Sequence, residues 1–249
     1  QMEIQGELLY TGKTKQVFTT DNPEQIIIHY KDDALAYNGI KRAQIANKGV
    51  LNNKISSLIY NKLEEEGFNT HFIKRLSDRD QLCKRKKHLI QLEFIVRNIA
   101  AGSMAKRLGL KTGTQLSTPV YEITYKSDEL SDPLINEHHA VALGLSTYDE
   151  LAEIHDIVRR LNETLKRIFA EIGITLVDVK FEFGRTADGT LVLADEISPD
   201  TTRLWDTKTL ESLDRDRFRK DLGKISEAYE EILNRLSEKA IGKNRHSIS

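Results

Sequence analysis

LVDVKFEFG, residues 176–184, alternates between two kinds of side chain. Every second position is apolar, at Val177, Val179, Phe181 and Phe183. The positions between them carry a negative, a positive and a negative charge, at Asp178, Lys180 and Glu182. Successive side chains of a strand point to opposite faces of the sheet. The stretch therefore predicts a strand with one face in a core and one charged face.

The segment that follows indicates a function for the charged face. TLVLADEIS is a second strand-like segment, and a turn containing Asp188 and Gly189 precedes it. If these two residues form the whole turn, counting outward places Glu182 opposite Asp195. Like charges on opposed residues repel, so a cation between them is expected, and Mg²⁺ prefers carboxylate and phosphate oxygens. The pair predicts a metal clamp for a nucleotide, with Lys180 near a phosphate or a substrate carboxylate.

Other interpretations of this face stay open. Charged residues that alternate along a strand most often form a solvated face. A bulge at Gly184 or a slip of one residue would break the predicted pairing. The carboxylates could also pair with Lys180 and Arg203, without any metal.

The rest of the chain predicts an α+β fold with antiparallel sheets and flanking helices. Strand-like segments gather in the first hundred residues, whereas helices alternate with the hairpin later. Apolar residues at helical spacing predict helices over about residues 45–66, from Thr147 to Gly173, and along a face from Phe218 through Leu222 to Leu236. A β-rich lobe of residues 1–88 would hinge on a larger α+β lobe of residues 89–249.

Composition excludes several classes of protein. The 249 residues carry a formal net charge of -1, which favours neither nucleic acid nor an anionic membrane as the main partner. We find no apolar run near the roughly 20 residues of a membrane span, and no signal peptide. The single cysteine, Cys83, excludes an intrachain disulfide and has no nucleophile signature around it. These features predict a cytoplasmic protein.

Two further segments are suited to binding anions. YTGKTKQVF places Gly12, Lys13 and Lys15 at a turn between strands, where glycine allows close approach and lysine supplies charge. VRNIAAGSMAKRLG places Arg97 at a strand end, before Gly102 and Ser103 open a short helix. The simpler interpretations are a plain hairpin with surface lysines and an ordinary helix cap.

The order of these segments resembles one enzyme family. LEFIVRNIAAGS, LVDVKFEFG and ADEISPDTTRLWD are similar to the signature segments of the SAICAR synthetases, and YTGKTK and YKSDELSDP match as well. The resemblance runs from about Leu8 to Leu236. It implies a two-lobed fold related to ATP-grasp and kinase-like architectures, with ATP in the cleft and Mg²⁺ as cofactor.

The resemblance also implies an activity. The family is an ATP-dependent carbon–nitrogen ligase of purine biosynthesis that joins CAIR, a carboxylated aminoimidazole ribotide, to L-aspartate. The products would be SAICAR, ADP and phosphate, and an acyl phosphate is the expected intermediate. The small-molecule substrates would be the partners, and a homodimer or larger homo-oligomer is expected.

Site residues carry over from the family by position. Those expected at ATP are Gly12, Lys13, Lys15, Val17, Leu89, Lys126 and Glu182. Those expected at the metal are Glu182 and Asp195. Those expected at the ribotide are Arg97, Ser103, Arg203, Asp178 and Lys180. Of these, Asp178 and Lys180 would act beside the reacting carboxylate, as the catalytic pair.

One departure and two rival functions remain. Gln91 stands where the family usually has proline, which leaves the conformation of the hinge open. A small-molecule kinase of related architecture would use the same ATP loop and metal pair. A nucleotide-binding regulatory protein would have little need for Arg97, Ser103 and Arg203 together.

Overall fold

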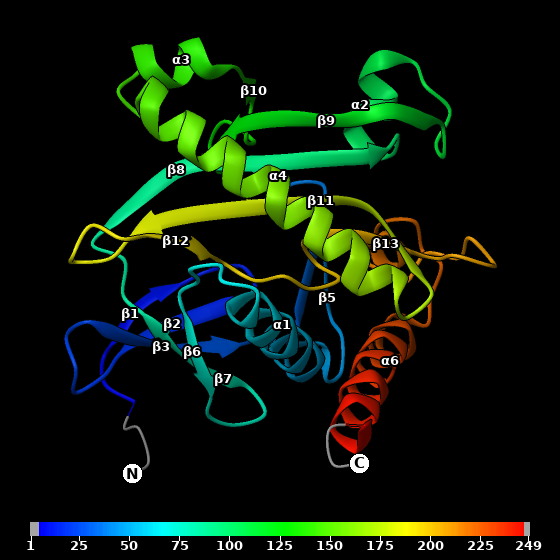
Figure 1. Cartoon of the computed structure of the whole chain (residues 1–249), viewed down its shortest axis with the longest axis horizontal. Coiled ribbons are helices and arrows are strands. Elements are labelled where there is room, and N and C mark those ends of the chain that lie inside the picture. Colours follow the sequence, from blue (N-terminus) through cyan, green and yellow to red (C-terminus); the bar gives the residue numbers. More distant parts are fainter. Residues whose placement is uncertain (1–4, 247–249) are drawn as a thin grey trace.

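The computed structural model describes residues 5–246, which form two main antiparallel sheets with helices around them (Figure 1). The smaller sheet has the order β1-β2-β3-β7-β6. Its strands are β1 (Leu8–Thr11), β2 (Lys15–Thr19), β3 (Gln25–Tyr30), β6 (Phe72–Arg75) and β7 (Asp80–Lys84). A separate hairpin consists of β4 (Asp33–Ala36) and β5 (Lys41–Gln44).

The larger sheet is built around the opening stretch. Its order is β10-β9-β8-β11-β12, and β13 also pairs with β11. Its strands are β8 (His88–Ile99), β9 (Gln115–Tyr125), β10 (Leu134–Ile135), β11 (Ile174–Arg185), β12 (Leu191–Ala194) and β13 (Thr202–Asp206). Because β11 pairs with β8 along one edge and with β12 and β13 along the other, it is an interior strand of this sheet.

Three long helices and three short ones flank the sheets in the described part of the chain. They are α1 (Lys48–Glu65), α2 (Gly102–Leu108), α3 (Glu137–Ala142), α4 (Tyr148–Ala170), α5 (Asp216–Arg219) and α6 (Ile225–His246). In Figure 1, α4 crosses one face of the larger sheet, in front of β11. The predicted mixed fold of antiparallel sheets and flanking helices is confirmed.

Two of the helix predictions are confirmed, and the third is confirmed for the part from Ile225 to Leu236, which lies in α6, but wrong at its start. The helices expected over residues 45–66 and after Thr147 are α1 and α4, and the Thr147 side chain accepts the backbone N–H of Glu150 at 3.1 Å. Phe218, however, lies in α5, and Leu222 lies between α5 and α6. Left-handed backbone at Asp221, Gly223 and Lys224 interrupts what was expected to be one helix.

One hydrophobic core joins the large sheet to α1, α4 and α6. From β11 it includes Val179, Phe181 and Phe183, each at most 2% exposed. Val177 is an exception to the predicted alternation, because a bulge interrupts the pairing of β11 with β13 at this residue. Val177 therefore packs in a smaller cluster with Ile99 and Ala101, away from the main core.

All strands of the smaller sheet precede those of the larger sheet in the sequence, since β7 ends at Lys84 and β8 begins at His88. The proposed lobe boundary at residues 88 and 89 is close to this connection and stays a prediction. Among the described residues, no helix combines the length and the apolar character that crossing a membrane requires.

We predict that Leu165→Ala will lower the free energy of unfolding by about 2–5 kcal/mol, because it opens a cavity in the core. Leu165 is fully buried on α4. Lys166→Ala is the matched control, since the Lys166 side chain is 42% exposed, and it should change stability by less than about 0.5 kcal/mol. Urea denaturation measures both. Equal costs for the two variants would contradict the assigned core face of α4.

Candidate active site

A pocket of about 520 Å³ lies between the smaller sheet and the strands of the larger one. One part of its lining is apolar, contributed by Leu9, Val17, Ile26, Ile28, Leu89, Ile90, Phe183 and Ala194. Another part is charged, contributed by Lys15, Arg85, Lys86, Lys126, Asp128, Glu182 and Asp195. A pocket with these two kinds of lining suits a ligand that joins an apolar ring to a charged group.

The charged part holds most of a carboxylate–lysine cluster, which comprises Lys15, Lys126, Lys180, Glu182 and Asp195; Lys180 is not among the lining residues but lies 4.0 Å from Glu182. The Lys15 ammonium lies 2.9 Å from Asp195 Oδ1 and 2.5 Å from Glu196 Oε1. The Lys126 ammonium lies 2.8 Å from Glu182 Oε2. Both carboxylates predicted at the metal are therefore paired with lysines.

The two carboxylates of this cluster differ in how readily they are protonated. Burial and the charge of Asp195 raise the pKa of Glu182. Burial alone would also raise the pKa of Asp195, but neighbouring lysines, Lys15 foremost, hold it well below its usual range. The pKa values of the two acids thus shift in opposite directions. This is expected when two carboxyl groups share one buried site, because ionisation of one makes ionisation of the other harder.

Lys180 lies between two glutamates. Its ammonium is 2.9 Å from Glu93 Oε2 and 4.0 Å from Glu182 Oε1. Burial would lower the pKa of Lys180, but the charges of Glu182 and Glu93 hold it above its usual range. The side chain is thus a fixed positive charge at neutral pH, suited to facing an anion and unsuited to acting as a base.

The predicted ribotide residues form a second group, the arginine cluster, which comprises Arg97, Ser103, Asp178 and Arg203. Asp178 Oδ2 lies 3.3 Å from Arg97 Nη1 and 3.1 Å from Arg203 Nη1. Arg97 also donates to Ser103 Oγ at 3.0 Å. Arg97 and Asp178 are both at most 5% exposed. Lys180, expected with this group, instead pairs with Glu93 and Glu182.

The predicted register of the hairpin is wrong by one residue. Glu182 pairs with Ala194, because the loop contains three residues and Thr186 faces Thr190. Among Ala187, Asp188 and Gly189, only the glycine adopts a positive φ. This corresponds to a three-residue loop rather than the two-residue turn, which needs φ above zero at both positions.

The carboxylates nevertheless line the same pocket. Strand β12 ends at Ala194, and Asp195 adopts φ 62. In a continuing strand, the side chain of Asp195 would point to the face opposite to that of Ala194. The left-handed backbone at Asp195 interrupts this alternation, so its side chain is not confined to that face. The structural irregularity expected at Gly184 occurs in the pairing with β8, whereas the pairing with β12 is regular.

Five of the seven residues predicted at ATP line the pocket, namely Lys15, Val17, Leu89, Lys126 and Glu182. Gly12 and Lys13 lie at the turn between β1 and β2, outside this lining. Lys13 pairs at 3.1 Å with Asp128, which is itself part of the lining. Gln91, the departure from the family pattern, also lines the pocket, and its carbonyl accepts Lys126 N–H at 3.0 Å.

Sequence reasoning missed the glutamates that accompany the cations. Glu196 is 3% exposed and pairs with Lys15. Glu93 pairs with Lys180, and Glu122 contacts Arg97 at 3.2 Å and Arg107 at 2.9 Å. The one available signal was that Glu93 and Glu122 interrupt otherwise apolar segments, and it did not identify their partners.

The donor set fits a magnesium ion that a nucleotide helps to bind. Glu182 and Asp195 supply hard carboxylate oxygens, and Mg²⁺ is usually bound by one or two carboxylates together with phosphates and water. The described residues contain no group of three or more His, Cys, Asp or Glu side chains that could hold a metal ion.

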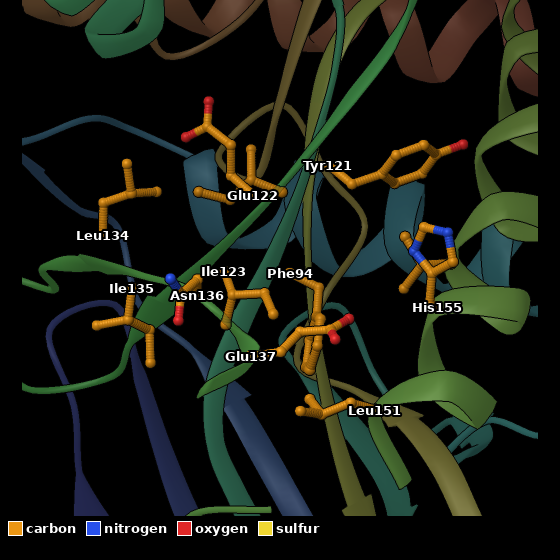
Figure 2. A pocket seen from close by; sticks show the side chains of 12 residues that line it. Phe94, Tyr121, Glu122, Ile123, Leu134, Ile135, Asn136, Glu137, Leu151 and His155 are labelled. Atoms are coloured by element: carbon orange, nitrogen blue, oxygen red, sulfur yellow. The ribbon is translucent and has the colours of Figure 1, made fainter. Parts of the chain in front are cut away.

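A second pocket, of about 330 Å³, lies between β9, β10 and α4. Figure 2 shows His155 and Leu151 on the α4 side, and Ile123 and Ile135 across from them. Every predicted site residue lies in the described part of the chain, and none of them lines this pocket. Glu122 lines it and pairs with Arg97, so this pocket borders the arginine cluster without containing a predicted site residue.

Comparison with known proteins identifies one family. A family model described as SAICAR synthetase matches residues 8–236. The chain is 60% identical over 234 residues to a protein of Fusobacterium nucleatum named phosphoribosylaminoimidazole-succinocarboxamide synthase. That match covers 94% of this chain and 98% of the relative.

Solved structures agree with this match. The crystal structure of phosphoribosylaminoimidazole-succinocarboxamide synthase from Ehrlichia chaffeensis superposes with a TM-score of 0.90 at 44% identity, covering 93% of this chain and 98% of the other. A SAICAR synthetase in complex with ADP superposes with a TM-score of 0.89 at 46% identity, with the same coverage.

We predict that Gly102→Ala will destabilise the protein more than Gly109→Ala. Both glycines have positive φ, so alanine at either costs about 1–2 kcal/mol. A Cβ on Gly102 would lie 2.4 Å from Arg203 Nη2, whereas one on Gly109 meets nothing within 4 Å. Asp178 and Asp216 anchor this guanidinium, so its displacement should cost about 1 kcal/mol or more in addition. Urea denaturation should separate the variants, and indistinguishable midpoints would count against an anchored Arg203.

Proposed function

The chain belongs to the SAICAR synthetase family, and we propose that it joins CAIR to L-aspartate with the conversion of ATP to ADP and phosphate. Membership makes the chain an enzyme, a ligase of purine biosynthesis. One observation carries the proposal of ATP: Lys15, Lys126, Glu182 and Asp195 lie in a pocket that also has an apolar lining. This combination suits a purine ring and its polyphosphate.

We assign the ATP site to the larger pocket. Val17 and Leu89 would pack against the adenine, and Lys15 and Lys126 would face the phosphates. A solved relative that is 46% identical binds ADP. Gly12 and Lys13, at the turn between β1 and β2, would cover the phosphates from the side of the smaller sheet.

Glu182 and Asp195 would hold Mg²⁺ together with the phosphate oxygens. The bound ion would neutralise charge on the phosphates during transfer. Lys15 and Lys126 pair with these two carboxylates, so when they face the phosphates both lysines would exchange a carboxylate partner for a phosphate.

The arginine cluster is the proposed site of the ribotide, chiefly of its 5′-phosphate. Arg97 and Arg203 offer several N–H donors, and Ser103 adds a hydroxyl at the start of α2. Asp178 bridges the two guanidinium groups and so orients them before substrate arrives. Asp178 would face the ribotide on the side of its imidazole.

The proposed reaction has two steps. A carboxylate oxygen of CAIR attacks the γ-phosphorus, the bond to the β-phosphate oxygen breaks, and ADP leaves. The amine of L-aspartate then attacks the acyl carbon, inorganic phosphate leaves and the nitrogen loses a proton. The first step brings two anions together, so the fixed charge of Lys180 would lower its barrier.

The remaining assignments are also proposals. The two lobes, residues 1–88 and 89–249, would be arranged as in ATP-grasp and kinase-like folds. The enzyme would act in the cytoplasm as a homodimer or larger homo-oligomer.

We predict that the purified protein will release ADP steadily only when CAIR and L-aspartate are both present. A coupled assay for ADP, run with each substrate omitted in turn, measures this. Steady ADP release with CAIR alone, together with a phosphorylated product, would identify a kinase instead. Tight binding of ATP without any release would identify a regulatory protein.

We predict that Lys180→Ala will lower kcat by at least about 100-fold, the usual cost of losing one group that stabilises charge in a transition state. The melting temperature should stay close to that of the wild type. Lys166→Ala, at an exposed position of α4, is the control and should turn over normally. Near-normal kcat in Lys180→Ala would remove this residue from the mechanism.

A further inference from the structure

The backbone at Asp195 is held in a conformation that aspartate rarely adopts. Its φ of 62 lies in the left-handed region, which costs a non-glycine residue on the order of 1–3 kcal/mol. Such a conformation persists only where the surroundings stabilise it. The side chain of Asp195 lines the candidate ATP pocket, so whatever holds this backbone also determines where its carboxylate lies.

Two buried side chains bind the carbonyl group of Asp195. The Tyr60 hydroxyl lies 2.8 Å from this oxygen and 2.9 Å from the carbonyl oxygen of Ala194. His71 Nε2 lies 2.9 Å from the Asp195 oxygen. Tyr60 and His71 are both fully buried. The carbonyl groups of Ala194 and Asp195, at the end of β12, are therefore held by hydrogen bonds from these side chains.

Lys86 determines which nitrogen of His71 donates. The Lys86 ammonium lies 3.0 Å from His71 Nδ1, and an ammonium can only donate a hydrogen bond. Nδ1 is therefore the acceptor, so the proton of the neutral ring is on Nε2, which faces the Asp195 carbonyl. The Lys86 contact orients the ring for the bond to Asp195.

The surrounding elements keep both donors in place. Tyr60 projects from α1, and its ring stacks on Phe72 with centroids 5.8 Å apart. The His71 ring lies 5.4 Å from that of Tyr60. The backbone N–H of His71 also donates to the Leu193 carbonyl at 2.8 Å. Side chains and backbone of the N-terminal third thus bind the end of β12 together.

We propose that Tyr60 and His71 are positioning residues, which hold the left-handed backbone of Asp195 so that its carboxylate lies in the ATP pocket beside Glu182. In this role both residues act through the backbone of Asp195; Tyr60 lies outside the lining of the pocket, whereas His71 is part of it. The inference rests on the proposed function, because it takes Asp195 as a ligand of the Mg²⁺ that accompanies the nucleotide.

Tyr60→Phe tests the inference with the loss of one oxygen atom. We expect the affinity for the Mn²⁺–ADP complex, measured by titration calorimetry, to fall about tenfold, as for the loss of one buried hydrogen bond. The KM for ATP should rise, while the KM for CAIR stays within about twofold. Tyr229→Phe is the matched control, because Tyr229 is also buried and its hydroxyl binds Asp200 at 2.7 Å, outside the pocket lining.

His71 provides a second test that includes a rescue. His71→Leu removes the donor and should weaken Mn²⁺–ADP binding, whereas His71→Gln can still donate to the Asp195 carbonyl and should restore most of it. If His71→Leu does not fold, Tyr60→Phe and His71→Gln decide the question. A purely structural role would lower the melting temperature of Tyr60→Phe and Tyr229→Phe alike and leave Mn²⁺–ADP affinity unchanged in both, which would overturn the inference.

Asp195→Asn separates failure of the inference from failure of the proposed function. If this variant loses Mn²⁺–ADP affinity while Tyr60→Phe keeps it, the positioning role is wrong and the metal assignment stands. If Asp195→Asn binds Mn²⁺–ADP as the wild type does, the metal assignment is wrong and the positioning role fails with it.

Discussion

Two carboxylates that share a buried site require positive charge beside them, and the candidate active site depends on this constraint. Glu182 and Asp195 line one pocket, and the charge of Asp195 helps to raise the pKa of Glu182. Lys15 and Lys126 pair with them directly, and Lys180 lies 4.0 Å from Glu182. Because ammonium groups and a metal ion can neutralise the same oxygens, the cluster can bind a polyphosphate by exchanging partners.

The fold brings this cluster together around β11. Val179, Phe181 and Phe183 anchor one face of the strand in the main core, which fixes the side on which Lys180 and Glu182 lie. The bulge at Val177 leaves Asp178 paired in register with both Arg97 and Arg203. One strand thus supplies a residue to the arginine cluster and two residues to the carboxylate–lysine cluster.

The sequence predicted the parts of this arrangement that depend on local pattern. The alternation of β11 from Val179 to Phe183, the N-cap of α4 and the turn holding Gly12 and Lys13 follow from residue type and spacing, and the structure confirms them. The hairpin register could not be predicted in this way, because Asp188-Gly189 is compatible with loops of two and of three residues. Nor could the left-handed backbone at Asp195, which depends on tertiary contacts from Tyr60 and His71.

The central claim is that Glu182 and Asp195 jointly bind the metal of the nucleotide. A crystal structure with ADP and Mn²⁺, with the ion located from its anomalous signal, tests it most directly. The account predicts one ion with an oxygen of each carboxylate at roughly 2.1 Å, the spacing at which Mg²⁺ binds oxygen. It also predicts that Lys15 and Lys126 turn to the phosphates. An ion bound by phosphates alone, with both lysines still paired to the carboxylates, would contradict it.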